Sequence, residues 1–332
     1  MAVYTTIDNP ELYFQTKLYT GSGANQSITL DGSEDMQPNL VWIKDRTNTN
    51  NQVWTDSVRG VEKVILSNAG NAEATYTDGL TAFNSDGFSL GDDDDGQMNV
   101  NTNACVAWCW KESATAGFDI VSYAGSSGAK TESHSLSAVP SVIIVKNISA
   151  SANWRVYHVS QGNTKAAALN SSGEQAVVDS GFWNDTTPTS SVFTIGSGYA
   201  DSTNASGNNF ISYLWAGKQG YSKFGSYTGN GNANGPYIHL GFRRAMIIVK
   251  SATETRNWRL WDNKRSTFNL TDEILYPDLS NAEATGDSEI DMLSNGFKLR
   301  KNSDNTSGET YIYMAFAEQP FVNSKGVPAN AR

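Results

Sequence analysis

Charged side chains are scarce in this sequence. They make up 17% of its 332 residues, whereas they form about 25% of an average soluble domain. Long solvent-exposed helices need many glutamate, lysine and arginine side chains, so this shortage argues against a helical protein. Positively charged residues are the rarer kind: 24 lysines and arginines stand against 34 aspartates and glutamates, which leaves a net charge of −10. Because phosphate contacts need a basic surface, we expect no nucleic-acid partner.

The sequence also lacks a long apolar run. None approaches the roughly 20 residues that a membrane-spanning helix needs, so we expect no membrane insertion. Residues 1–17 are polar and lack the apolar segment of a secretory signal. We therefore expect synthesis in a cytoplasm, whatever the final location of the protein.

Cysteine and histidine are almost absent. Cys105 and Cys109 lie in an apolar run that reads as a strand, which would separate them by roughly 13 Å. A disulfide needs Cα atoms within about 7 Å, so we expect two buried free thiols. The three histidines, His134, His158 and His239, lie in no nucleophile or metal-binding motif. No feature pairs two carboxylates across a cleft either, so we expect a protein that is not an enzyme.

Glycine, asparagine, serine and threonine fill the gap that the charged residues leave. The chain has 29 glycines, yet 39% of its residues are hydrophobic and 11% are aromatic. Turn-forming residues that alternate with short apolar runs are typical of strands joined by polar loops. The composition therefore predicts an all-β protein with real cores.

Internal repetition is the clearest pattern. A Tyr-x-Gly motif begins at Tyr19, Tyr123 and Tyr227, at steps of 104 residues. An apolar run closed by a lysine follows each motif and ends at Lys44, Lys146 and Lys250. Six further aromatic landmarks recur in the same order, and we expect them in repeated cores: Trp54, Trp154, Trp258, Trp110, Trp215 and Phe316. We expect the lysines to keep strand ends soluble.

The repetition predicts three tandem antiparallel β-sandwiches of jelly-roll or lectin-like type. Copies of about 100 residues are the size of such a domain. The predicted divisions are an N-terminal arm at 1–14, sandwiches at 15–115, 116–219 and 220–321, and a C-terminal tail at 322–332. A line of sandwiches and a closed triangle both fit the pattern. We expect the arm to dock on a neighbouring subunit.

Several segments resemble a module that is common in tailed, often marine, bacteriophages. The first copy carries the resemblance at 13–21, 37–44, 56–60, 85–91 and 106–111, and the end of the third copy at 315–321. Segment 56–60 is expected in the first copy alone. Proteins with this module are usually labelled tail fibre or virion structural protein. The resemblance implies a sandwich fold and a phage particle component, and it brings no catalytic residues.

Two sets of residues are candidate binding sites. Trp42, Trp183 and Trp261 follow the repeat less regularly. Burial in a core is the simpler interpretation of each ring, and stacking on sugar rings is the functional alternative. Asn230 and Asn232 would bond the sugar hydroxyls from a neighbouring polar loop.

The second candidate is the acidic run Asp92, Asp93, Asp94 and Asp95. Calcium takes six to eight oxygen ligands, and we assign it loosely to Asp92, Asp93 and Asp95. A solvated hairpin loop is the simpler explanation of the run.

These observations predict a non-enzymatic protein on the virion surface. A tail fibre or appendage protein that contacts host surface glycans is the first interpretation, and a head decoration protein that stabilises or coats the capsid is the alternative. A glycan-cleaving depolymerase is a distant third. Either virion interpretation implies contacts with other virion proteins and a homo-oligomer, because particle sites are symmetric. Analogy with phage fibres suggests a trimer.

Overall fold

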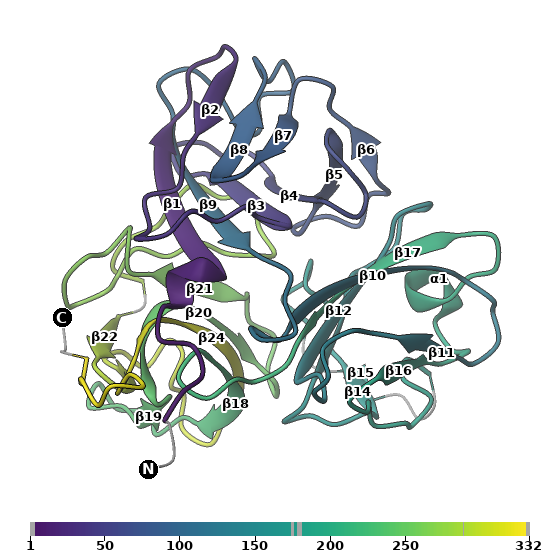
Figure 1. Cartoon of the computed structure of the whole chain (residues 1–332). Helices are drawn as coiled ribbons and strands as arrows, with labels where there is room; N and C mark the ends of the chain where they lie inside the picture. Colours follow the sequence, from purple (N-terminus) through teal and green to yellow (C-terminus); the bar gives the residue numbers. More distant parts are fainter. Residues whose placement is uncertain (1–3, 174–175, 178–180, 288, 330–332) are drawn as a thin grey trace.

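Short strands joined by turns make up almost all of the regular secondary structure (Figure 1). The structure is a computed structural model that describes residues 4–173, 176–177, 181–287 and 289–329. Both helices in this part of the chain are short, η1 (Pro10–Leu12) and α1 (Ala200–Thr203). Neither is long or apolar enough to cross a bilayer. The prediction of an all-β, antiparallel fold is confirmed.

Figure 1 shows the strands gathered in three lobes around a common centre. Lobe 1 spans residues 14–110 and pairs a large sheet, β1-β9-β3-β4-β5-β6, with a small sheet, β2-β8-β7. Its strands are β1 (Phe14–Thr20), β2 (Gln26–Ile28), β3 (Leu40–Asp45), β4 (Gln52–Asp56), β5 (Lys63–Leu66), β6 (Ala74–Thr75), β7 (Leu80–Asn84), β8 (Gly87–Leu90) and β9 (Ala104–Trp110).

Lobe 2 spans residues 118–215. Its large sheet has the order β10-β17-β12-β13. Two separate two-stranded sheets, β11-β16 and β14-β15, make up the rest of the lobe. The strands are β10 (Phe118–Ala124), β11 (Lys130–Ser133), β12 (Val142–Asn147), β13 (Arg155–His158), β14 (Lys165–Ala166), β15 (Ala176–Val177), β16 (Val192–Ile195) and β17 (Asn209–Trp215).

Lobe 3 spans residues 222–320. Its sheets have the orders β18-β24-β20-β21 and β19-β23-β22. The strands are β18 (Ser222–Thr228), β19 (Tyr237–His239), β20 (Phe242–Ser251), β21 (Arg259–Asp262), β22 (Ile290–Leu293), β23 (Gly296–Leu299) and β24 (Thr310–Pro320).

Four strands follow the same order in all three large sheets: β1-β9-β3-β4, β10-β17-β12-β13 and β18-β24-β20-β21. The register aligns them residue by residue. Leu40, Val142 and Met246 lie opposite Trp110, Trp215 and Phe316, respectively. We call residues that align in this way corresponding positions. The domain boundaries themselves stay predictions.

Each large sheet buries both of its faces. One face packs on the small strands of its own lobe, and the other faces the centre of the molecule, where the three lobes share one apolar cluster. On β12, Ile143 lies in the core of lobe 2, whereas its neighbours Val142 and Ile144 lie in the central cluster. Burial on both faces explains why these strands read as continuous apolar runs.

Aromatic side chains fill the central cluster. Its tryptophans are Trp42, Trp54, Trp108, Trp110, Trp154, Trp215 and Trp258. Rings from different lobes touch there: Trp54 and Trp154 have centroids 5.2 Å apart, and Trp110 lies 5.5 Å from Phe316. The remaining void measures about 10 Å³, at the limit for a single water. The lobes therefore form a closed triangle rather than a line.

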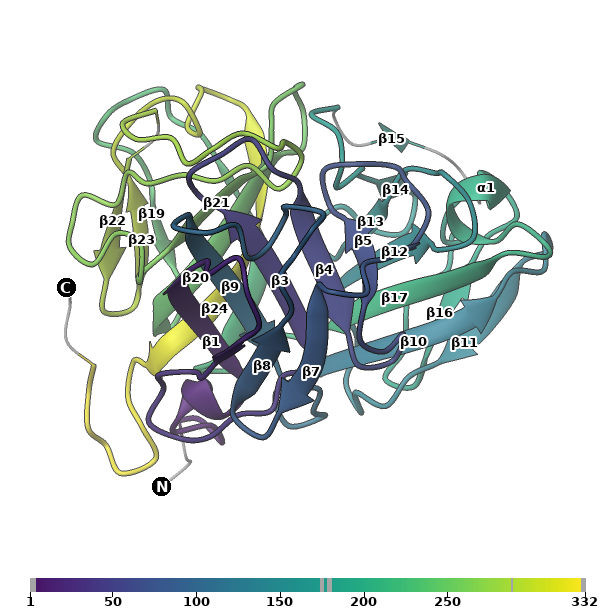
Figure 2. The ribbon, with the colours of Figure 1, turned by 90° about the horizontal axis from the view of Figure 1, so that it is seen from above.

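The N-terminal arm closes the triangle within the chain. The Tyr4 hydroxyl donates to the Gly241 carbonyl of lobe 3 at 2.7 Å, and Ile7 lies in the central cluster. The Ser324 N–H of the tail donates to the Asp8 carboxylate at 2.7 Å. The described parts of the arm and of the tail lie beside lobe 3 (Figures 1 and 2). The described part of the arm thus docks on its own chain, and docking on a neighbouring subunit stays a prediction; residues 1–3 and 330–332 lie outside the described part.

Candidate functional site

The three tryptophans predicted to bind sugars are buried. Trp42 lies in the central cluster, Trp183 in the core of lobe 2 and Trp261 in the core of lobe 3, with exposed fractions of 1%, 2% and 0%. A ring without an exposed face cannot stack on a sugar from solvent, so this part of the prediction is revised. Trp42 and Trp261 lie in strands β3 and β21 of large sheets that are covered on both faces, and Trp183 lies in the segment between β15 and β16 that packs into the core of lobe 2.

Asn230 and Asn232 lie in an exposed loop of lobe 3. Buried Asn305 holds this loop, because its Oδ1 accepts the Asn230 N–H at 2.8 Å and its Nδ2 donates to the Asn232 carbonyl at 2.7 Å. Asn99 and Asn204 are buried beneath the corresponding loops of the other lobes and bond them in the same way. Sequence analysis assigned this structural role to none of the three, because an asparagine between loop residues has no apolar pattern to mark it. A ligand role for Asn230 and Asn232 stays a prediction.

The Tyr-x-Gly motif is built around these asparagines. The Tyr19 hydroxyl donates to the Met98 carbonyl, next to Asn99, at 2.6 Å. A Cβ on Gly21 would lie 2.1 Å from the Val100 carbonyl oxygen, so only glycine fits there. Both contacts recur in lobes 2 and 3. The motif is therefore a structural requirement of the loop.

The tryptophans that follow the lysines do not all occupy corresponding positions. The register aligns Trp154 and Trp258 with Gln52, and Trp54 lies two residues further along β4. All three tryptophans lie in the central cluster, as do Trp110, Trp215 and Phe316. Counting from the lysines alone therefore misaligns the first lobe by two residues.

The residues at the position of Gln52 join each lobe to another. The bonds run from Trp154 Nε1 to the Leu66 carbonyl, from Trp258 Nε1 to the Ala168 carbonyl, and from Gln52 Nε2 to the Tyr276 carbonyl. Lobe 2 thus donates to lobe 1, lobe 3 to lobe 2, and lobe 1 to lobe 3. The three bonds form a cycle that closes only when all three lobes are present.

The recurring lysines are buried, which contradicts the expectation of soluble strand ends. Their ammonium groups donate to backbone carbonyls: Lys146 Nζ reaches the Gly70 carbonyl of lobe 1 at 2.9 Å, and Lys250 Nζ reaches the Ser251 carbonyl at 2.7 Å. Burial lowers the pKa of Lys44 and of Lys146 to about 8. These lysines tie loops together instead of facing water.

The acidic run divides between two roles. Asp93 is buried, and its Oδ2 accepts two backbone N–H groups of its loop at 2.7 and 2.6 Å. The carboxylates that approach one another are those of Asp78, Asp92 and Asp94, within 4.8 Å. The predicted set of Asp92, Asp93 and Asp95 is therefore not brought together. Exposed acidic groups of this kind are common without an ion.

Buried charges hold the seam between lobes 1 and 2. Arg59 Nε contacts Asp56 Oδ2 at 2.5 Å, and both side chains are almost fully buried. The Tyr213 hydroxyl of lobe 2 donates to the same Asp56 oxygen at 2.7 Å. Arg59 Nη1 also pairs with Glu73 Oε2 at 3.2 Å. Because the carboxylate and the guanidinium are both hydrogen-bonded, the charges are compensated in the interior.

The same arrangement recurs between lobes 3 and 1. Arg265 Nε contacts Asp262 Oδ2 at 2.6 Å, and Trp108 Nε1 of lobe 1 donates to that oxygen at 3.1 Å. Arg265 Nη1 pairs with Glu283 Oε2 at 2.9 Å. The electrostatic contacts of Arg59 and Arg265 therefore match bond by bond.

The third seam, between lobes 2 and 3, uses a neutral group. His158 corresponds to Asp56 and Asp262, and its Nε2–H donates to the Tyr313 carbonyl at 3.1 Å. Its Nδ1 accepts the Ser160 N–H at 3.2 Å. Burial lowers the pKa of His158 to about 4, so the ring is neutral at pH 7 and is bonded through both nitrogens.

Two short motifs in the sequence mark these seams, and our sequence analysis missed both. Asp-x-x-Arg occurs at 56–59 and 262–265, and Asn-Ala-Glu-Ala-Thr occurs at 71–75 and 281–285. The full segment 56–60 does occur in the first copy alone, as expected, but its Asp-x-x-Arg part recurs at 262–265. The pattern is hidden because lobe 2 lacks it and carries His158 instead.

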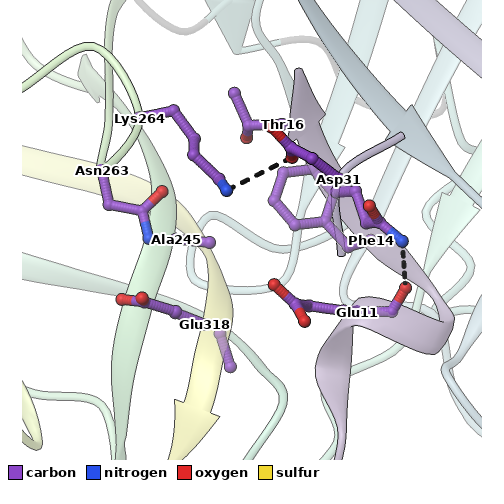
Figure 3. Close-up of a pocket in the computed structure, with 10 residues that line it drawn as sticks. Glu11, Phe14, Thr16, Asp31, Ala245, Asn263, Lys264 and Glu318 are labelled. Atoms are coloured by element: carbon purple, nitrogen blue, oxygen red, sulfur yellow. Dashed lines mark hydrogen bonds and ion pairs between the residues drawn. The ribbon is translucent and has the colours of Figure 1, made fainter. Parts of the chain in front are cut away.

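A small cavity lies at the seam of lobes 3 and 1 (Figure 3). Its volume is about 30 Å³. Thr16 Oγ1 and Asn263 Oδ1 line it, are buried and have no hydrogen-bond partner among the described residues. Lys264 and Asp31 pair beside them at 3.3 Å. Two free polar atoms and this volume suit one ordered water.

One protein family matches the chain over all three lobes. A family described as a domain of unknown function (DUF7483) matches residues 9–320. The chain belongs to that family. The DUF7483 match runs from the arm to the last residue of β24, so it takes in all three lobes together. No curated protein matches the chain.

Proposed function

We propose that the chain is a non-enzymatic structural component on the surface of a tailed phage particle, where it serves as a tail fibre or appendage protein. The resemblance of segments such as 13–21 and 37–44 to phage virion modules carries this proposal. The seams between lobes support the proposal, because the charges of Arg59 and Arg265 are neutralised by buried carboxylates at these seams. Such use of charged groups suits a rigid building block.

Contact with host surface glycans is part of the proposal. The exposed loop with Asn230 and Asn232 offers amides to sugar hydroxyls. Tyr237, at 45% exposure, adds an aromatic ring at the end of the same loop. Amphipathic rings beside polar groups suit sugars, which have apolar C–H faces. The buried tryptophans have no part in this surface.

Head decoration is the second candidate, and the closed triangle of lobes favours it. One chain covers an area that would otherwise need three separate sandwich subunits, which suits a protein that coats a capsid. In either location the partners would be other virion proteins. Symmetric particle sites lead us to propose a homo-oligomer, with a trimer as the analogy with fibres suggests.

Gold-labelled antibody against the protein on purified virions, viewed by electron microscopy, tests the proposal. Particles that lack the protein serve as the control. Label on the tail or its fibres is the expected result, and label over the head would select capsid decoration instead. Intact, infective particles without label would overturn the virion proposal.

A further inference from the structure

A polar groove of about 490 Å³ runs along the seam between lobes 1 and 2. Lobe 1 contributes Val58, Arg59 and Glu73 to its walls, and lobe 2 contributes Ser122, Ile148 and Asn209. The buried side of the groove is the ion pair of Arg59 and Glu73 described above. The groove therefore has one carboxylate, that of Glu73, and one guanidinium, that of Arg59, among its lining residues.

The seam between lobes 3 and 1 shows the same place in a filled state. Glu283 corresponds to Glu73, and Arg46 corresponds to Ile148. The backbone confirms the match, because the Glu283 N–H donates to the Arg46 carbonyl at 3.0 Å and the Glu73 N–H donates to the Ile148 carbonyl at 3.1 Å. The two seams differ at this point in two side chains. Ile148 replaces Arg46, and Lys63, whose Nζ donates to Thr75 Oγ1 at 2.8 Å, replaces Glu273, which lies 3.9 Å from Arg46 Nη2.

Arg46 grips Glu283 with two nitrogens. Its Nε lies 3.0 Å from Glu283 Oε2, and its Nη2 lies 2.6 Å from Glu283 Oε1. Parallel bonds of this kind match the planar guanidinium to the carboxylate. Glu283 thus holds two arginines, because Arg265 already contacts Oε2 from below.

Glu73 holds only one arginine. Its Oε2 pairs with Arg59, and its Oε1 has no hydrogen bond or ion pair with any described residue. The Glu73 side chain is 22% exposed, against 13% for Glu283. Ile148 leaves room where Arg46 would stand, so a carboxylate oxygen faces the groove without a cation.

We propose that this groove binds an arginine side chain presented by a partner protein. The guanidinium takes the place that Arg46 takes at the other seam and forms the two parallel bonds to Glu73. Arginine suits the site better than lysine, because a bidentate fork matches the carboxylate. The net charge of −10 favours a basic partner surface. This inference does not depend on a location on a virion.

The probe is a capped Gly-Arg-Gly peptide, titrated into the full chain and followed by NMR shifts of the backbone amides of Glu73 and Glu283, which every variant retains. A capped peptide with neutral citrulline in place of arginine is the matched control. The arginine peptide is expected to bind about tenfold more tightly than the citrulline peptide, the equivalent of one charge-assisted hydrogen bond. Equal binding of the two peptides would overturn the proposal.

Three variants locate the site. Glu73→Gln is expected to remove the preference for arginine, and Ile148→Arg is expected to abolish binding because it installs the side chain of the filled seam. Arg46→Ile is expected to add a second site of the same preference at the other seam. Unchanged binding by Glu73→Gln would overturn the assignment, and this test stands even if Ile148→Arg does not fold.

Discussion

Individual polar side chains in this protein mostly bond backbone groups. Asn99, Asn204 and Asn305 each hydrogen-bond backbone groups of a loop that would otherwise need water as their partner. Lys146 does the same for the Gly70 carbonyl in a loop of another lobe. A buried partner of this kind is hard to replace, because its removal leaves N–H or C=O groups without water or protein.

Asn305→Ala tests this role. The change leaves the Asn230 N–H and the Asn232 carbonyl without their partner, so we expect a loss of about 2–3 kcal/mol in the free energy of unfolding. Asn302→Ala, at an exposed position nearby, should stay within about 0.5 kcal/mol. Urea unfolding of both variants measures the difference, and equal losses would contradict the account of the loop.

His158 makes the stability of the protein depend on pH. Its pKa is about 4 in the folded chain, against 6.5 for a histidine exposed to water, so the unfolded chain binds the extra proton between these values. Stability contributed by neutral His158 is therefore present above pH 6.5 and is lost as pH falls through that window. The loss amounts to about 3 kcal/mol at pH 4.

His158→Gln isolates that effect. Glutamine can still donate to the Tyr313 carbonyl and does not titrate. Urea unfolding at pH 7 and pH 4.5 should show a smaller loss on acidification for the variant than for the unchanged chain. Raised carboxyl pKa values, such as about 7 for Asp278 through burial, act in the opposite direction in both proteins, so the comparison removes them. Parallel losses would contradict the role of His158.

At the scale of elements, the tryptophans that immediately precede strands β13 and β21, Trp154 and Trp258, donate hydrogen bonds to a neighbouring lobe. Trp154→Phe keeps most of the ring in the central cluster and removes the donor to the Leu66 carbonyl. Trp110→Phe is the matched control, because Trp110 Nε1 has no partner among the described residues. We expect Trp154→Phe to lose about 1–2 kcal/mol more in urea unfolding. A larger loss for Trp110→Phe would contradict a directional role for the seam bond.

The sequence predicted the strands well and their alignment poorly. Apolar runs such as 142–146 marked strands, because burial on both faces leaves no polar residue in them. Trp54 misled the alignment, because aromatic spacing does not show that Gln52 donates in its place. The seam charges of Asp56 and Asp262 escaped notice, because contacts between lobes follow from the triangle and not from any local pattern.

At the scale of the whole molecule, the central cluster makes the lobes interdependent. Trp110, Trp215 and Phe316 come from three different lobes and pack against one another at the centre. An isolated lobe would expose the central face of its large sheet to water, because the other two lobes bury this apolar face in the full chain. Sequence alone left a line and a triangle open, because either arrangement needs the same apolar strands.

Differential scanning calorimetry of the full chain tests this interdependence most directly. A shared core and a cycle of seam bonds predict one cooperative transition, with a van't Hoff enthalpy equal to the calorimetric enthalpy. Three sandwiches that unfold separately would give resolved transitions, or a van't Hoff enthalpy of about one third of the calorimetric value. The first result would support a single closed unit, and the second would contradict it.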